Sequence, residues 1–237
     1  MSFRWTLARE TDADGLTGPV ARGEPPPAFL SRHEAELLAG LAFAPRRRKW
    51  LLGRLAAKRV LAEAFRELCG VEPLPIDVTV ANDPAGVPFA TVAGERVPWC
   101  LSISHRAGVA LAILAREPGV ALGGDLETVA PRDPGLARDF FTPTEQERVA
   151  AAPPGAERDR LVARIWSAKE SVLKALGVGL RVDTRAIEIA GEGGLPWPGV
   201  PEGFRPLDVR HGPSGARFLA VTRDEGPLVL TVARVAG

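Results

Sequence analysis

Two long stretches of the chain carry apolar residues at helical spacing, and short apolar runs typical of strands follow each of them. The first stretch is RRRKWLLGRLAAKRVLAEAFRELCG, residues 46–70, and its final Gly70 suits the end of a helix. The second is RLVARIWSAKESVLKALG, residues 160–177, which ends at Gly177 in the same way. We therefore expect two long helices, the second with a buried stripe formed by Leu161, Ile165, Ala168 and Val172.

Strand-like runs occur in the same order after each predicted helix. They lie at residues 76–80, 100–104 and 109–114 in the first case, and at 187–190, 216–222 and 228–235 in the second. The interval from Lys58 to Lys169 is the same as that from Ile76 to Ile187, which indicates an internal duplication. The predicted fold class is α+β with pseudo-twofold halves, residues 1–118 and 119–237, each a helix packed on a small antiparallel sheet.

Composition excludes several classes of partner. The chain has 237 residues and a net charge of +1, so it lacks the broad basic field that non-specific nucleic-acid binding requires. The first 15 residues contain no apolar run of the kind found in signal peptides, so we expect none, and no apolar run approaches the roughly 20 residues of a membrane-spanning helix. Two cysteines make neither a disulfide framework nor a metal site. We expect a cytoplasmic monomer that binds neither nucleic acid nor membrane.

Between the halves, the stretch GVALGGDLETVAPRD (119–133) contains two acidic residues after an apolar run. In an extended strand Asp125 and Glu127 project to the same side, because side chains alternate with a period of two. A strand that ends in a solvated acidic turn would show the same pattern. A third carboxylate, Glu170 in the second predicted helix, would complete a set of oxygen donors suited to Mg²⁺.

Lysine is rare in this chain, yet two lysines flank Glu170. Only four of the 30 basic residues are lysines, and two of them stand in WSAKESVLK, residues 166–174. With the buried stripe placed as above, Lys169, Glu170 and Lys174 fall on or beside the opposite face of the helix, where they could line a cleft. A compact ammonium suits contact with phosphate oxygens beside a metal. An exposed Glu170 to Lys174 pair at i, i+4 would also explain two of these residues.

GGDLE (123–127), followed about 40 residues later by WSAKESVLK, resembles the paired signature of the 4′-phosphopantetheinyl transferases, G-x-D-x-E and W/F-x-x-K-E-x-x-x-K. The stretches LLGRLAAKRVLAE, GVPFA and SISHRAG extend the resemblance over most of the chain. The length and duplicated plan resemble the larger surfactin-synthetase (Sfp) type. The resemblance implies Mg²⁺-dependent transfer of the 4′-phosphopantetheine group from coenzyme A to a serine of an apo acyl- or peptidyl-carrier protein. The resemblance also implies release of 3′,5′-ADP and a role in polyketide or nonribosomal peptide biosynthesis.

The resemblance also implies roles for single residues. It gives Asp125, Glu127 and Glu170 as magnesium ligands, and Glu170 and Lys174 as catalytic residues. It places coenzyme A, the co-substrate, in the cleft between the halves, in contact with nine residues: Arg46, Arg48, Lys49, Gly86, Pro88, Ser104, His105, Lys169 and Lys174. Within RRRK (46–49) the register of the phosphate contact is open, and that run could be a solvated helix start. Without the family, Ser104 could be a strand-end hydroxyl and His105 a structural histidine.

Two other classes of function remain compatible with the sequence. A different Mg²⁺-dependent phosphotransferase or hydrolase could use the same carboxylates on a nucleotide. A non-catalytic binding module could use the charged helix to recognise a partner, although binding alone requires no set of three carboxylates.

Overall fold

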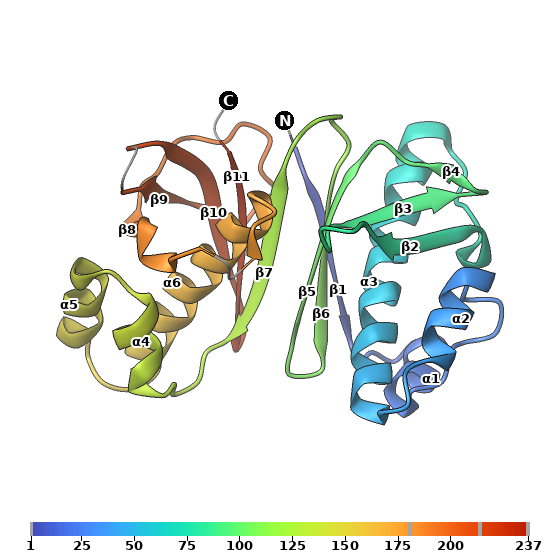
Figure 1. Cartoon of the computed structure of the whole chain (residues 1–237), viewed down its shortest axis with the longest axis horizontal. Helices are drawn as coiled ribbons and strands as arrows, with labels where there is room; N and C mark the ends of the chain where they lie inside the picture. The colour runs from blue at the N-terminus through green and yellow to red at the C-terminus, as the bar shows by residue number, and fades with distance from the viewer. Residues whose placement is uncertain (1, 180–181, 213–214, 236–237) are drawn as a thin grey trace. The chain divides into compact units, whose positions relative to one another are not determined.

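The computed structural model describes residues 2–179, 182–212 and 215–235. Contacts between its residues divide the chain into two compact units, Phe3–Gly119 and Val120–Gly237, the latter together with Ser2. The sequence places the boundary between residues 118 and 119, and the outer ends of the expected halves, residues 1 and 236–237, lie outside the described residues. We call Phe3–Gly119 the first unit and Val120–Gly237 the second unit, and Figure 1 labels the elements of each.

The first unit contains one long helix packed on two three-stranded antiparallel sheets, ordered β1-β6-β5 and β2-β3-β4. Its helices are α1 (Thr17–Arg22), α2 (Arg32–Ala39) and α3 (Ala44–Cys69), followed by a short 3-10 helix, η1 (Pro75–Asp77). Its strands are β1 (Arg4–Arg9), β2 (Val78–Asn82), β3 (Pro88–Val92), β4 (Glu95–Arg96), β5 (Cys100–Arg106) and β6 (Val109–Ala115).

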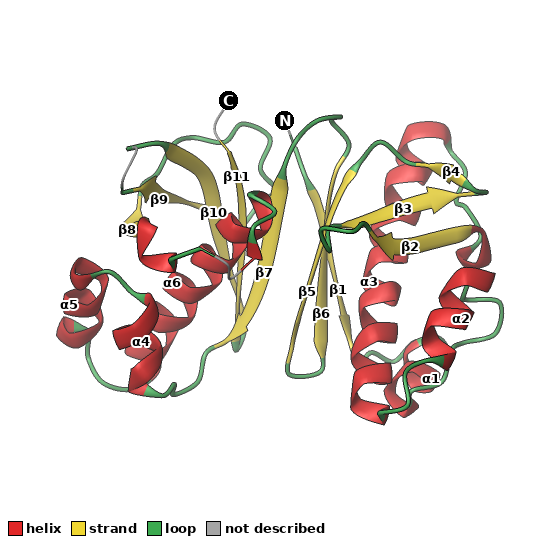
Figure 2. Cartoon of the chain, viewed as in Figure 1, coloured by secondary structure: helices red, strands yellow, loops and turns green. Residues whose placement is uncertain are grey.

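The second unit contains one long helix packed on a five-stranded antiparallel sheet, ordered β7-β11-β10-β9-β8. Its helices are α4 (Pro134–Phe140), α5 (Pro143–Ala151) and α6 (Ala156–Ala175), with a 3-10 helix, η3 (Thr184–Ala186). Its strands are β7 (Leu122–Thr128), β8 (Ile187–Glu192), β9 (Arg205–His211), β10 (Arg217–Glu225) and β11 (Leu228–Val235). Figure 2 shows these helices in red and the strands in yellow.

The α+β class and both long helices are confirmed, and the duplication stays a prediction. Gly70 ends α3 with a left-handed φ of 73°, a conformation that favours glycine. The strand expected at 76–80 begins instead with η1, and β2 starts at Val78. The first unit holds two sheets where one was expected. In the described part of the chain, no helix is both long and apolar enough to cross a membrane.

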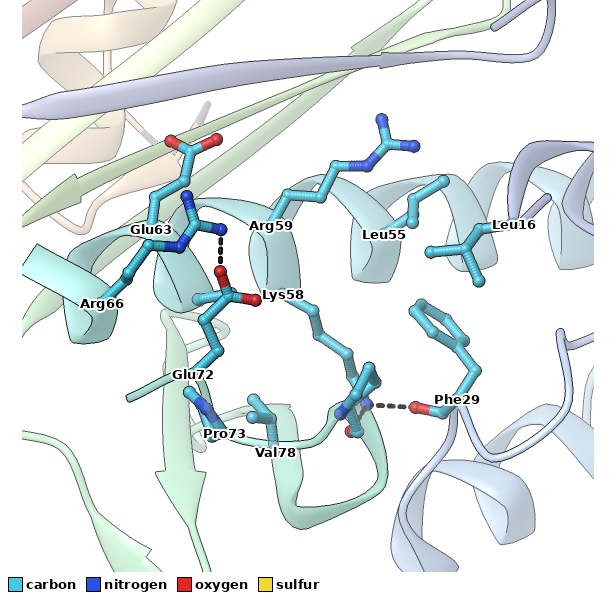
Figure 3. Close-up of a pocket in the computed structure, with 12 residues that line it drawn as sticks. Leu16, Phe29, Leu55, Lys58, Arg59, Glu63, Arg66, Glu72, Pro73 and Val78 are labelled. Atoms are coloured by element: carbon cyan, nitrogen blue, oxygen red, sulfur yellow. Dashed lines mark hydrogen bonds and ion pairs between the residues drawn. The ribbon is translucent and has the colours of Figure 1, made fainter. Parts of the chain in front are cut away.

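One buried polar network recurs in the two units. In the first unit, the carboxylate of Glu34 lies beneath α3 and accepts hydrogen bonds from the Ser31 amide (3.1 Å), the Val80 amide (3.0 Å) and Lys58 Nζ (2.6 Å). Lys58 Nζ also donates to the carbonyls of Phe29 and Pro75, each at 2.7 Å. Figure 3 shows the Lys58 side chain extending from α3 to the Phe29 carbonyl. We call Ser31, Glu34 and Lys58 the Glu34 network.

The second unit carries the same network, displaced along the chain by the interval that separates Lys58 from Lys169. Glu145 accepts from the Thr142 amide (2.8 Å) and the Ile189 amide (2.7 Å), and its carboxylate pairs with Lys169 Nζ at 2.9 Å. Lys169 Nζ also donates to the carbonyls of Thr184, at 3.0 Å, and Ile187. Ser31 and Thr142 each cap their helix through a capping box with the glutamate. We call Thr142, Glu145 and Lys169 the Glu145 network.

Candidate functional site

Strand β7 and helix α6 approach each other closely, and Gly123 permits this. A Cβ added to Gly123 would come within 2.5 Å of the Ala175 backbone nitrogen and 2.8 Å of Lys174 Cβ, so only glycine fits there. Gly124 follows it in the same buried strand. The remainder of GGDLE therefore lies directly against the C-terminal turns of α6, which carry Glu170 and Lys174.

The two acidic residues of β7 are buried, and each is held by a basic side chain. Asp125 is 4% exposed, and its Oδ1 accepts a hydrogen bond from Lys174 Nζ at 2.7 Å. Lys174 Nζ also donates to the Gly124 carbonyl at 3.2 Å. Glu127 is 7% exposed and pairs with Arg132, which also donates to the Thr128 carbonyl at 3.1 Å. The alternative of a solvated acidic turn is therefore wrong.

Glu170 faces these two carboxylates from α6. Burial raises the pKa of Glu170, the negative charges of Asp125 and Glu127 raise it further, and Lys174 opposes them. Asp125 and Glu127 are therefore close enough to Glu170 to act on its pKa, and we call these three carboxylates the acidic site. A carboxylate with a raised pKa has a greater affinity for a proton, which is the property a general base requires.

The donor set of the acidic site has the chemistry that Mg²⁺ takes, because carboxylate oxygens are its usual protein ligands. Within the described residues, however, no three acidic, histidine or cysteine side chains are gathered as closely as a metal site requires. Lys174 pairs with one oxygen of Asp125, and Arg132 pairs with one oxygen of Glu127. A metal ion bound at the acidic site would therefore lie beside these two cations and share the carboxylates with them.

The expected placement of Lys169 on the face opposite the core is wrong. Its side chain is fully buried, and its ammonium contacts Glu145 and the carbonyls of Thr184 and Ile187 in the Glu145 network. An ammonium has three donors, and these three acceptors use all of them, so none is left for a phosphate. The physical reason is that α6 is buried on almost every side, including Ser167 and Ser171, so a single apolar stripe does not define its core face.

In the first unit, α3 and the strands beside it form a pocket of about 390 Å³, which we call the α3 pocket. It brings together five of the residues predicted to contact coenzyme A: Arg46, Lys49, Gly86, Pro88 and His105. The pocket is also lined by Trp50, Arg54, Asn82 and Ile103, none of which was predicted. Arg46, Trp50 and Arg54 stand four residues apart on α3, so a single helical face presents two arginines and an indole to the pocket.

Two glycines shape the α3 pocket. Gly86 has a φ of 87° in the turn between β2 and β3, where Asp83 Oδ1 accepts hydrogen bonds from the Ala85 and Val87 amides at 2.9 Å. Gly53 lies on α3 against His105, because a Cβ added to Gly53 would come within 2.8 Å of His105 Cε1. The position of the His105 imidazole in the pocket therefore depends on the absence of a side chain at Gly53.

The remaining two predicted contacts of the first unit, Arg48 and Ser104, do not line the α3 pocket. Arg48 lies against Gly23, which follows α1. Ser104 is buried in β5 between Ile103 and His105, and it projects to the other side of the strand because side chains alternate. Of the basic residues 46–49, Arg46 and Lys49 line the α3 pocket, and the residue that contacts phosphate stays a prediction.

Sequence reasoning missed two basic residues that the structure places at these sites. Arg54 could have been found from its helical spacing to Arg46, since residues eight apart lie on one face of a helix. Arg132 could not have been found in this way, because it lies in a loop after β7, beyond the strand that carries the Glu127 it binds.

The chain is similar to one family model and to several curated proteins, all described as 4'-phosphopantetheinyl transferases. Residues 121–214 match the model of the family described as the 4'-phosphopantetheinyl transferase superfamily. This segment includes β7 and α6, which carry the acidic site and Lys174.

Three curated proteins are similar to the chain. "Putative 4'-phosphopantetheinyl transferase slr0495" of Synechocystis is 31% identical over 56% of this chain and 51% of its own length. The 4'-phosphopantetheinyl transferase of Bacillus subtilis is 28% identical over 68% of this chain and 66% of its own length. The 4'-phosphopantetheinyl transferase HetI of Nostoc is 28% identical over 69% of this chain and 65% of its own length. The matched part of the chain thus spans about half to two thirds of the length of these relatives, and the chain is similar to 4′-phosphopantetheinyl transferases over that part.

Proposed function

We propose that the protein transfers the 4′-phosphopantetheine group of coenzyme A to a serine of an apo acyl- or peptidyl-carrier protein and releases 3′,5′-ADP. The acidic site carries this proposal, because it places three interacting carboxylates and Lys174 on β7 and α6, inside the segment that matches the transferase family. The names of the three relatives support the same reaction class.

In the proposed reaction the serine oxygen attacks the phosphorus of coenzyme A that carries the pantetheine arm. The bond from this phosphorus to the bridging oxygen of the pyrophosphate breaks, and 3′,5′-ADP leaves with that oxygen. The serine proton passes to Glu170, the carboxylate of the acidic site that α6 contributes. Lys174, at the edge of the acidic site, would balance negative charge on the phosphates.

Magnesium dependence forms part of the proposal. Asp125, Glu127 and Glu170 would hold the ion, with Lys174 and Arg132 beside their carboxylates. A bound Mg²⁺ would supply charge neutralisation at the pyrophosphate. The nucleotide part of coenzyme A would bind in the α3 pocket, where Arg46 and Lys49 make no ion pair within the described residues. The Sfp subtype, the polyketide or peptide pathway, the cytoplasmic location and the monomeric state stay predictions.

The test is to incubate the protein with coenzyme A, Mg²⁺ and a panel of apo carrier proteins, and then to weigh the carriers by mass spectrometry. We expect one carrier to gain the mass of one phosphopantetheine group, with 3′,5′-ADP released in equal amount. Asp125→Asn should abolish the gain. Asp208→Asn is a matched control, because Asp208 is also held by basic residues in the second unit but lies outside the acidic site.

The alternative functions give different results in the same experiment. Consumption of coenzyme A without a carrier would favour a hydrolase that uses the same carboxylates. Binding of a carrier with no change in its mass, even with coenzyme A and Mg²⁺ present, would favour a non-catalytic binding module.

A further inference from the structure

Arg54 is the most deeply buried cation of the α3 pocket. Its side chain is only 9% exposed, and its guanidinium lies over the ring of Trp50 at 4.4 Å. Within the described residues its Nε makes no hydrogen bond, and its one ion pair is a loose contact with Glu34 at 3.7 Å. Burial lowers the pKa of Arg54, and Glu34 opposes this, yet a guanidinium remains charged in a protein. Arg54 is therefore a buried charge with weak compensation.

Glu34 has little capacity to compensate Arg54, because the Glu34 network already occupies it. Its carboxylate receives the Lys58 ammonium at 2.6 Å together with two backbone amides. Lys58 and Arg54 thus place two positive charges beside one negative charge, all of them buried. An excess buried positive charge is costly unless an anion lies beside it.

The Glu145 network of the second unit shows that this arrangement does not require the extra charge. The number of residues from Glu34 to Glu145 equals that from Lys58 to Lys169. Counting the same number of residues from Arg54 leads to Ile165, which therefore stands at the corresponding position of the second unit. Ile165 is 1% exposed and packs in the apolar core. One lysine and one glutamate therefore complete the network in the second unit, and an apolar side chain suffices at the position of the arginine. The second unit therefore has no positive charge at the position that corresponds to Arg54.

The second pocket of the first unit offers a contrast on another face of α3. It measures about 230 Å³, and Figure 3 shows that α3 contributes Lys58, Arg59 and Arg66 to its wall. Each of these cations has a carboxylate partner: Glu34 for Lys58, Asp12 and Asp14 for Arg59, and Glu72 for Arg66. In the α3 pocket, Arg46 and Lys49 have no such partner among the described residues. The α3 pocket is therefore the one of the two whose positive charge is left for a ligand.

We propose that Arg54 is an additional anion-binding residue of the α3 pocket, and that its guanidinium contacts a phosphate of the nucleotide part of coenzyme A. The choice of coenzyme A as the source of the phosphate rests on the proposed function. Trp50 lies against one face of the guanidinium, and both side chains line the pocket, so the stacked arginine keeps its planar edge of N–H donors for a ligand there. A phosphate would supply the negative charge that the Glu34 network lacks.

The test compares Arg54→Met with Arg59→Met, a matched control on the same helix whose arginine is already paired with aspartates. The probe is 3′,5′-ADP, and its affinity is measured by isothermal titration calorimetry. We expect Arg54→Met to weaken binding roughly 10- to 100-fold, the range for one lost hydrogen bond between charged groups. Arg54→Lys should give a smaller loss, because it keeps the charge without the planar guanidinium. Arg59→Met should bind as the wild type does.

The melting temperature without ligand separates the proposed role from a structural one. Arg54→Met should melt at the same temperature as the wild type or higher, because it removes an excess buried charge. Unchanged affinity for 3′,5′-ADP, or failure of Arg54→Met to fold, would overturn the proposal, since the network would then need this arginine. The same holds if the wild type binds no 3′,5′-ADP.

The proposed function can fail separately from the role of Arg54. Tight, Arg54-dependent binding of 3′,5′-ADP without transfer to any carrier would refute the transfer reaction and leave the anion site intact. Normal transfer by an Arg54→Met protein with unchanged 3′,5′-ADP affinity would do the opposite.

Discussion

Replacing Lys169 by methionine tests whether this lysine belongs to the protein interior or to the coenzyme A site. Methionine keeps an unbranched, flexible side chain of similar reach and removes only the ammonium. In the structure that ammonium is fully buried, pairs with Glu145 at 2.9 Å and donates to the carbonyls of Thr184 and Ile187. We therefore expect Lys169→Met to lower the stability of the second unit.

The loss of stability can be sized from the carboxylate of Glu145, which the variant leaves without its lysine. Glu145 is 0% exposed, so removal of the lysine leaves a buried carboxylate without its counter-charge, although the amides of Thr142 and Ile189 still donate to it. Breaking a buried pair in this way costs about 3–5 kcal/mol. At a typical dependence of roughly 1–3 kcal/mol per molar urea, the midpoint of unfolding falls by roughly 1 M or more.

The assay is urea denaturation followed by far-ultraviolet circular dichroism, combined with coenzyme A binding below the unfolding transition. Folded Lys169→Met should bind coenzyme A as the wild type does. A double variant that also carries Glu145→Gln should recover part of the lost stability, because no buried charge remains unpaired. Lys49→Met is the contrasting control. That lysine is exposed and lines the α3 pocket, so its loss should weaken coenzyme A binding with little effect on folding.

One result would refute this reasoning. If Lys169→Met were as stable as the wild type and bound coenzyme A many-fold more weakly, the ammonium would be a phosphate contact, as the family resemblance implies. The buried pair with Glu145 would then not describe the protein in solution.

Three further substitutions test the geometry of the two sites. Gly53→Ala should weaken 3′,5′-ADP binding several-fold in calorimetry, because its Cβ would displace the His105 imidazole; unchanged affinity would remove His105 from the pocket's function. Gly123→Ala should lower the free energy of unfolding, measured by urea denaturation, by roughly 1–3 kcal/mol or more, because its Cβ would clash with the backbone of α6. A variant as stable as the wild type would contradict the close approach of β7 to α6. Glu170→Gln should slow transfer at least ~100-fold, and the metal-free variant should be more stable than the metal-free wild type at neutral pH. The pKa of Glu170 is raised on folding, so the folded wild type holds its proton to higher pH than the unfolded chain, and its stability falls as pH rises from 4.5 through the folded pKa. Equal pH profiles of melting temperature for the two proteins would contradict that shift.

The sequence pattern was sufficient for the long helices because their boundaries are local signals. Gly70 and Gly177 adopt left-handed φ values directly at or after the helix ends, and such positions can be recognised from residue type alone. Strands β1, β3, β4 and β9 were not predicted, and two of them, β1 and β9, illustrate why. Each owes its place to pairing with a distant partner, β1 with β6 and β9 with β8 and β10, and long-range pairing leaves a weak signature in a short segment.

The acidic site could be predicted from the sequence because each of its two pairs of residues lies within one short segment. Asp125 and Glu127 are two apart on a strand, and Glu170 and Lys174 are four apart on a helix, so each pair follows from one periodicity. The partner of Lys169 did not follow from any periodicity. Glu145 comes from a separate short helix, α5, earlier in the chain, and only the fold brings it beneath α6.

The four lysines of this arginine-rich chain now divide into two groups by their surroundings. Lys58 and Lys169 are buried, and each ammonium meets one carboxylate and two backbone carbonyls. Three acceptors around one nitrogen suit a compact head with three donors, whereas a planar guanidinium spreads its donors and would overfill a site with no exposed surface. Lys49 lines the α3 pocket, and Lys174 lies on Asp125 at the edge of the acidic site. Rarity of lysine therefore does not by itself indicate catalysis, because half of these lysines hold helices in place. What distinguishes the other half is that their side chains remain partly exposed, where a phosphate could reach them.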